Sequence, residues 1–216
     1  MGATRPASRS RLVRREAIVA CLLLCCVLAA CESNTPPIAP LGPNAVIVAF
    51  GDSLTFGTGA EPEQSYPARL ASALSRTVVN AGVPGEVTAE GLRRLPSVLE
   101  RDGPALVVLC HGGNDILRKV EPSETERNLR QMIEQIRASG AAVVMLGVPE
   151  RSLFLGTAEV YERVAEDLEV PIDGDIIGDL LGDNAKKSDP IHPNALGYAA
   201  LADAVEGLLR KTGAIR

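Results

Sequence analysis

AVIVAFGDSLTFG, residues 45–57, indicates the fold class most clearly, because an unbroken apolar run passes directly into a turn of small and polar residues. The run Ala45–Phe50 shows no alternation between polar and apolar positions, which is typical of a strand buried on both faces of a sheet. Two more runs of this kind, Ala105–Cys110 and Ala141–Gly147, follow along the chain. These three runs predict the centre of an α/β fold.

Weaker patterns supply the remaining elements. Short strands are predicted over Thr77–Val79 and Val170–Ile172, and helices over Tyr66–Ser75, Thr88–Arg101, Ser123 to the stop at Gly140, Thr157–Leu168 and Ala195–Arg210. Pro96 should kink or shorten the second helix, and Ser123 with Glu126 predicts a capping box for the third. Strands that alternate with helices indicate a three-layer α/β/α sandwich with a mainly parallel, flavodoxin-like sheet. In such sheets the ligand site lies at the carboxyl ends of the strands.

The N-terminus has the pattern of an export signal. Five arginines in the first fifteen residues precede the apolar run Ala17–Ala30, which is short for a membrane span. The run ends in Leu28-Ala29-Ala30-Cys31, and small residues before such a cysteine resemble the lipobox of bacterial lipoproteins. That resemblance implies that Cys31 is acylated and becomes the mature N-terminus. A signal peptide cleaved elsewhere and an uncleaved anchor are the alternatives.

The chain therefore divides into three predicted parts: a signal peptide (1–30), a lipidated cysteine with a Pro-rich tether (31–44), and one folded domain (45–216). The lipid would make the membrane contact. Glu32 follows the cysteine instead of the Asp that retains lipoproteins at the inner membrane of enteric bacteria. We thus expect an exported lipoprotein of the cell envelope, in the outer membrane and facing the periplasm.

Charge and cysteine usage exclude several classes of function. Removing residues 1–30 takes away five of the 22 basic residues and one of the 27 acidic ones, which leaves a net charge of −9. Such an acidic domain argues against binding of nucleic acid and against a polybasic membrane patch. Cys110 is the one cysteine after residue 31, so no disulfide within the domain is expected, and its apolar neighbours predict a buried thiol. A cysteine hydrolase that uses Cys110 beside His111 is a remote alternative. The shortage of His and Cys ligands disfavours a metal site. No cofactor is implied, and we expect a monomer.

Four polar, Gly-rich segments should meet at one edge of the sheet, and three of them directly follow predicted strands. They are Gly51–Thr55, Asn80–Gly85, His111–Asp115 and Asp189–Asn194. Ser53 alone would read as a helix-capping residue. His192, however, lies three residues after Asp189, so the carboxylate can hold one ring nitrogen while the other faces Ser53. These three residues therefore predict nucleophilic catalysis by a serine.

Acyl transfer also needs donors for the oxyanion that forms during attack. Gly85 permits close approach of its backbone N–H, Asn114 offers a side-chain amide, and the N–H of Ser53 would be the third donor. Gly82 lies close to Gly85 and is the alternative at that position. His111 has no acidic neighbour in the sequence and is interpreted as a residue that lines the site or supports its structure.

The segments resemble the sequence blocks of the GDSL, or SGNH, hydrolase family, and the resemblance spans about Val46–Leu209. Gly51-Asp52-Ser53-Leu54 matches the first block, Gly85 the second, Gly113-Asn114-Asp115 the third and Asp189-Pro190-Ile191-His192-Pro193 the fifth. The resemblance implies a catalytic triad of Ser53, Asp189 and His192, and an oxyanion hole of Ser53, Gly85 and Asn114. It implies a serine esterase of arylesterase, lysophospholipase or acyl thioesterase type, which forms an acyl-enzyme on small acyl-ester or lipid substrates.

Other readings remain open at this point. An acetyl-esterase that acts on acetylated carbohydrate, or a non-catalytic binding protein, could share the same fold. A phosphate-binding loop is disfavoured because residues 51–59 contain no lysine and Asp52 adds negative charge. Thr55 replaces the second glycine of Gly-x-Ser-x-Gly, so the turn is not the usual α/β-hydrolase elbow. We also hypothesise that Leu153, Phe154 and Leu155, in the loop Pro149–Gly156, form part of an acyl-binding wall.

Overall fold

The structure is a computed structural model that describes Gly2, residues 35–150 and residues 156–216. The predicted signal peptide, Cys31 and the loop residues Leu153, Phe154 and Leu155 lie outside the described residues. The compact unit Thr35–Arg216 contains the sheet and its helices.

A parallel sheet of five strands lies at the centre of the described chain, in the order β2-β1-β3-β4-β5. The strands are β1 (Ile47–Gly51), β2 (Val78–Gly82), β3 (Leu106–Cys110), β4 (Ala142–Leu146) and β5 (Ile172–Asp173). Each neighbouring pair is parallel. The predicted parallel, flavodoxin-like sheet is confirmed. The strand order reverses between β1 and β3, and this switch point is where ligands bind in such sheets.

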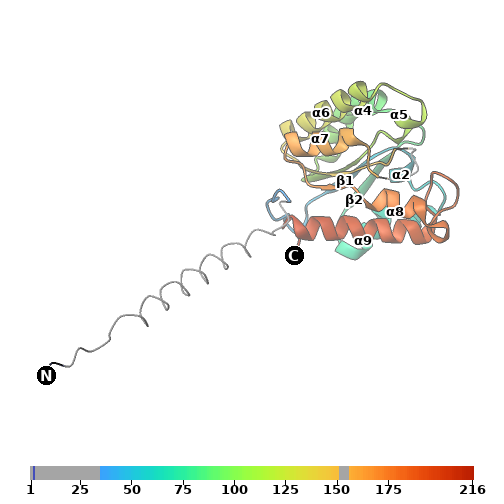
Figure 1. Cartoon of the computed structure of the whole chain (residues 1–216). Helices are drawn as coiled ribbons and strands as arrows, with labels where there is room; N and C mark the ends of the chain where they lie inside the picture. Colours follow the sequence, from blue (N-terminus) through green and yellow to red (C-terminus); the bar gives the residue numbers. More distant parts are fainter. Residues whose placement is uncertain (1, 3–34, 151–155) are drawn as a thin grey trace. The chain divides into compact units, whose positions relative to one another are not determined.

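Helices cover both faces of the sheet, which confirms the three layers (Figure 1). One layer contains α4 (Thr88–Asp102), α6 (Pro122–Ala138) and α7 (Glu159–Asp167). The other contains α3 (Tyr66–Leu74), α8 (Ile176–Gly182) and α9 (Ala195–Lys211). Single 3₁₀ turns lie at Pro62–Gln64 and Asn184–Lys186.

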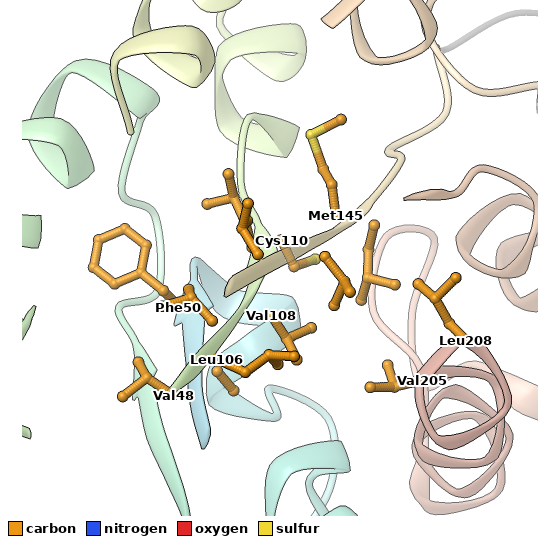
Figure 2. Close-up of a cluster of buried hydrophobic side chains, with 14 of the residues drawn as sticks. Val48, Phe50, Leu106, Val108, Cys110, Met145, Val205 and Leu208 are labelled. Carbon is orange, nitrogen blue, oxygen red and sulfur yellow. The ribbon is translucent and has the colours of Figure 1, made fainter. Parts of the chain in front are cut away.

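The strands are apolar throughout because side chains on both faces are buried. Val48 and Phe50 pair in register with Val107 and Leu109 of β3, so these four side chains share one face. The alternate residues of β3 face the other helical layer, where Val205 and Leu208 of α9 complete the core (Figure 2). Burial of each such side chain stabilises the fold by about 1.5–3 kcal/mol.

Two predicted helix details can be compared with the structure. The helix α4 continues through Pro96 to Asp102, so the proline does not shorten it. We attribute this to the burial of α4 residues on both sides of the proline, including Leu95 and Val98, which offsets the lost hydrogen bond. The capping box at Ser123 is wrong: α6 begins with Pro122, whose fixed φ suits the first helical position, and no side chain caps that end.

Three α-helices of the described chain were not predicted: α8, and two shorter ones that begin in the polar segments after strands. The two shorter ones are α2 (Ser53–Phe56) after β1 and α5 (Gly113–Leu117) after β3. Each contains too few residues to show a helical period in the sequence. They turn the chain sharply at the carboxyl edge of the sheet, which brings the first residues of both helices to the switch point.

Part of the Pro-rich segment packs on the domain. The N–H of Ile38 donates to the carbonyl of Thr212 at 2.9 Å, and that of Leu41 donates to Ala214 at 2.8 Å. Both side chains are partly buried and pack against the core. The folded unit thus begins before Ala45. Within the described residues, no helix is both long enough and apolar enough to cross a membrane.

Candidate active site

The hydroxyl of Ser53 is positioned by the tight turn that joins β1 to α2. Asp52 caps α2, since its Oδ1 accepts the N–H of Leu54 at 3.1 Å. Gly82 at the end of β2 lies against the backbone of α2: a Cβ there would overlap the nitrogen of Phe56 and lie 2.7 Å from its Cα. Only glycine permits this approach, which holds the short helix against the sheet.

His192 connects Ser53 to Asp189, as the sequence predicted. Its Nε2 lies 3.0 Å from Ser53 Oγ, and its Nδ1 lies 2.8 Å from Asp189 Oδ2. The other carboxylate oxygen accepts the N–H groups of Ile191 and His192 itself, both at 2.9 Å. With the Nδ1 proton on the carboxylate side, Nε2 presents a lone pair to the serine hydroxyl. This is the arrangement that a general base requires.

The carboxylate of Asp189 is held in its charged form. Partial burial acts to raise its pKa, but hydrogen bonds from the His192 ring and from the N–H of Ile191 outweigh this effect, and the pKa lies below its ordinary value. Asp189 therefore stays ionised at neutral pH and favours the imidazolium that forms when His192 takes a proton.

The loop that carries Asp189 and His192 is fastened to the start of α9. Asn194 caps α9 by accepting the N–H of Leu196 at 2.9 Å, and its amide donates to the carbonyl of Ala185 at 2.9 Å. Ser188 donates its N–H to the carbonyl of His192 at 2.9 Å. The histidine ring therefore rests on a loop with its own internal bonds, which limits its drift away from Ser53.

The structure separates the two candidate glycines. The N–H of Gly82 donates to the side chain of Asn80 at 3.0 Å, so it is already used. Gly85 has φ +79°, a left-handed conformation that favours glycine, and within the described part of the chain its N–H has no hydrogen-bond acceptor. The geometry thus favours Gly85 over Gly82 as a donor.

The amide of Asn114 lies at the same edge, between two acceptors. Its Nδ2 donates to the carbonyl of Glu86 at 3.0 Å and to Asp52 Oδ2 at 3.3 Å. Burial raises the pKa of Asp52. The following residue, Asp115, is also buried and accepts the N–H of Thr88 at 2.8 Å, which ties α5 to the start of α4.

His111 lies behind the site and is not part of the triad. It is 1% exposed, and its Nε2 lies 3.1 Å from Glu86 Oε2, so its interpretation as a supporting residue agrees with the structure. Sequence reasoning missed Glu86 and its partner Arg94. A usable clue is that an acidic residue directly follows the candidate oxyanion glycine, with an arginine on the next helix.

A cavity of about 310 Å³ opens at Ser53, Asn114 and His192. Its walls are largely aliphatic and include Leu54, Ile116, Leu117, Val148, Leu181 and Ile191. Among the described residues, no group of three or more His, Cys, Asp or Glu side chains could hold a metal ion. Cys110 is fully buried, and burial raises the pKa of its thiol, which agrees with a structural role.

Known proteins resemble this chain in sequence and fold. A profile of the GDSL-like Lipase/Acylhydrolase family matches residues 49–200. Esterase TesA of Pseudomonas aeruginosa is 39% identical over 107 residues, which cover 47% of this chain and 53% of that enzyme, about half its length. Thioesterase 1/protease 1/lysophospholipase L1 of Escherichia coli K12 is 30% identical over 165 residues, which cover 73% of this chain and 79% of that enzyme. A crystal structure of TesA is similar at a TM-score of 0.71 and 30% identity, over 77% of this chain and 99% of that one.

Proposed function

The chain belongs to the GDSL-like lipase/acylhydrolase family of serine ester hydrolases, and we propose that it cleaves carboxylic ester or thioester bonds through an acyl-enzyme on Ser53. One observation carries the proposal: contacts of 3.0 and 2.8 Å run without a break from the Ser53 hydroxyl through the His192 ring to the Asp189 carboxylate. Relatives named esterase and thioesterase/lysophospholipase support the same class of reaction.

The roles of the three residues follow from their geometry. Ser53 Oγ attacks the carbonyl carbon while His192 Nε2 takes the hydroxyl proton, and Asp189 stabilises the resulting imidazolium. His192 then gives that proton to the leaving alcohol or thiol. In the second half of the reaction, His192 takes a proton from water, which attacks the acyl-enzyme. The imidazolium then returns that proton to Ser53 Oγ as the acid leaves, so that Ser53 is restored.

The oxyanion of each tetrahedral intermediate accepts from the N–H of Ser53, the N–H of Gly85 and the amide of Asn114. The Asn114 amide exchanges its longer bond, at 3.3 Å to Asp52 Oδ2, for the oxyanion and keeps the bond to the Glu86 carbonyl. These donors sit on three different segments that meet at the strand ends, so they are in place before charge develops. Removal of one such donor typically costs about 100- to 1,000-fold in turnover.

The aliphatic walls of the cavity support the proposal that the enzyme recognises the acyl chain of its substrate. Its described walls bring apolar side chains close to Ser53, which suits an ester or lysophospholipid acyl chain better than an acetylated sugar. Leu117 lines the cavity and is 36% exposed, so substitution there tests the wall without opening the core.

Replacing Leu117 with Trp should reduce the ratio of octanoate to acetate ester turnover by about tenfold, a barrier difference of about 1.4 kcal/mol. Leu196→Trp is the matched control, because Leu196 is 66% exposed and does not line the cavity. An unchanged ratio in the Leu117 variant would remove this cavity as the acyl site.

We propose that export and lipidation at Cys31 place the enzyme in the cell envelope, as a monomer in the outer membrane that faces the periplasm. The arginine-rich start, the apolar run and the Ala29-Ala30-Cys31 ending support this. The compact unit begins at Thr35, so acylation of Cys31 would leave the domain intact. Ile38, in the Pro-rich segment that follows Cys31, bonds to Thr212, which lies at the end of α9 opposite the catalytic loop.

The test is turnover by residues 32–216 on p-nitrophenyl esters of increasing chain length, on lysophosphatidylcholine and on an acyl thioester. Ser53→Ala should lower hydrolysis of all of them to the background rate and leave the thermal unfolding midpoint unchanged. Turnover retained by this variant would refute the assignment of the nucleophile.

A further inference from the structure

A buried ionic cluster lies directly behind the proposed oxyanion hole. Glu86 is 7% exposed, and both of its carboxylate oxygens bind Arg94, at 2.7 Å to Nε and 2.6 Å to Nη2. His111 contacts the same carboxylate at 3.1 Å. Two parallel bonds from a guanidinium fix the orientation of a carboxylate, so Glu86 is held firmly in place. The three residues are called the Glu86 cluster below.

The protonation of His111 can be assigned from its two partners. Its Nδ1 accepts the N–H of Gly112 at 3.0 Å, so the proton lies on Nε2 and is donated to Glu86. Burial acts to raise the pKa of Glu86, but hydrogen bonds from Arg94 and His111 lower it to about 2. The carboxylate is thus charged throughout the pH range in which a histidine base operates.

The cluster connects all three segments that carry the oxyanion donors. Glu86 directly follows Gly85, and its carbonyl accepts from Asn114 at 3.0 Å. His111 precedes Asn114 by three residues. Arg94 donates to the carbonyl of Gly51 at 3.5 Å, two residues before Ser53.

Residues that do not belong to the Glu86 cluster also contact it and fix its position. Arg94 donates to the carbonyl of Ala81 at 3.1 Å, and its guanidinium lies 4.3 Å from the centre of the Phe50 ring. Gly91 of α4 lies against His111, and a Cβ there would come within 2.9 Å of the ring carbon Cδ2. The cluster therefore joins the core of the sheet to the loop that carries Gly85.

We propose that Glu86 is a positioning residue that aims the oxyanion donors Gly85 and Asn114 through its contacts with Arg94 and His111. The inference rests on the proposed function and adds to it a residue that touches neither substrate nor reacting atoms. Loss of the cluster lets the Gly85 loop and the Asn114 amide move apart. A misplacement of about 1 Å in such a site can cost about 100-fold in rate.

The test compares Glu86→Gln with Glu126→Gln, a control that removes the charge from another ion-paired glutamate. Glu126 binds Arg130 at 2.8 Å and Arg163 at 3.0 Å, and within the described chain its carboxylate bonds to no residue of a donor segment. Each variant is measured for kcat and KM on a p-nitrophenyl ester, for affinity toward an alkyl boronic acid, and for thermal unfolding. The boronic acid forms a tetrahedral adduct with the serine and so reports the oxyanion hole directly.

For Glu86→Gln we expect kcat to fall by about 30- to 100-fold, KM to change by less than about threefold, and boronic acid affinity to fall in step with kcat. Glu126→Gln should keep wild-type kcat and boronic acid affinity. A folded Glu86→Gln with kcat and boronic acid affinity within threefold of wild type would overturn the inference, as would an equal loss in the Glu126 control.

Arg94→Lys covers the case in which Glu86→Gln does not fold. Lysine keeps the positive charge but lacks the two-pronged contact, so kcat and boronic acid affinity should fall together by about tenfold. Wild-type values in folded Arg94→Lys would overturn the inference. Wild-type protein that neither hydrolyses esters nor binds the boronic acid would instead refute the proposed function itself.

Discussion

Asp189→Asn should nearly abolish turnover although it removes almost no volume. The carboxylate now accepts three hydrogen bonds, one from the His192 ring at 2.8 Å and two from backbone N–H groups at 2.9 Å. The asparagine oxygen can keep the two backbone bonds, which turns its NH₂ toward Nδ1 of the ring. Nδ1 must then accept, so the ring proton moves to Nε2, where it faces Ser53.

A ring with its proton on Nε2 cannot act as the base for Ser53. The loss expected from the wrong tautomer is about 10,000-fold in kcat, which corresponds to about 5 kcal/mol in the barrier. KM should change little, because Asp189 does not line the cavity.

The assay is steady-state hydrolysis of p-nitrophenyl butyrate between pH 6 and 9. Asp183→Asn is the control, since Asp183 belongs to the same region of the chain and accepts the N–H of Ala185 at 2.9 Å without touching the histidine. That variant should keep turnover within about twofold. A loss of less than tenfold in Asp189→Asn would contradict the reasoning and show that other groups orient the ring.

Three further predictions concern the glycines, acid stability and the anchor. Gly82→Ala should lower both stability and kcat, since its Cβ would displace the α2 backbone at Phe56. In Gly85→Ala the Cβ has room, but alanine strains the φ of +79° by about 1–2 kcal/mol, so stability should fall by that amount and kcat should also fall as the donor N–H moves; an unchanged kcat would count against the assignment of Gly85. Because the pKa of Glu86 is about 2 in the folded protein against 4.5 as its ordinary value, its stabilisation is complete above pH 4.5 and is lost as the pH falls toward 2. In urea unfolding, the free energy of unfolding of the wild type should fall by about 3 kcal/mol more than that of Glu86→Gln over this pH range. An equal fall in the two proteins would argue against a charged, buried Glu86. Cys31→Ser should move the protein from the membrane fraction to the soluble fraction, and continued membrane association would indicate an uncleaved anchor.

The central strands were predictable because their burial is complete. Ile47–Phe50 and Leu106–Cys110 are fully buried, so selection for apolar side chains acts at every position and leaves an unbroken run. The helices α2 and α5 gave no such pattern. Each spans about one turn, and its position depends on packing against neighbouring strand ends instead of on a period in its own sequence.

The site was predictable where its partners are neighbours in the chain. Asp189 and His192 lie three residues apart, so their contact could be expected before any fold was known. The pairing of Glu86 with His111 joins residues 25 positions apart and exists only because two loops meet behind the strand ends. In the sequence, the polar residues of such a cluster cannot be distinguished from charged residues of the surface. Only their burial in the structure reveals them.

The most direct test of the central claim is covalent labelling with a fluorophosphonate followed by peptide mass spectrometry. Only an activated serine should react, so we predict one adduct per wild-type molecule, on the peptide that carries Ser53, and none in Ser53→Ala. Labelling should also be lost in His192→Ala, because the hydroxyl would then have no base at 3.0 Å. A wild-type protein that hydrolyses esters without an adduct on Ser53, or with an adduct on another residue, would contradict the account.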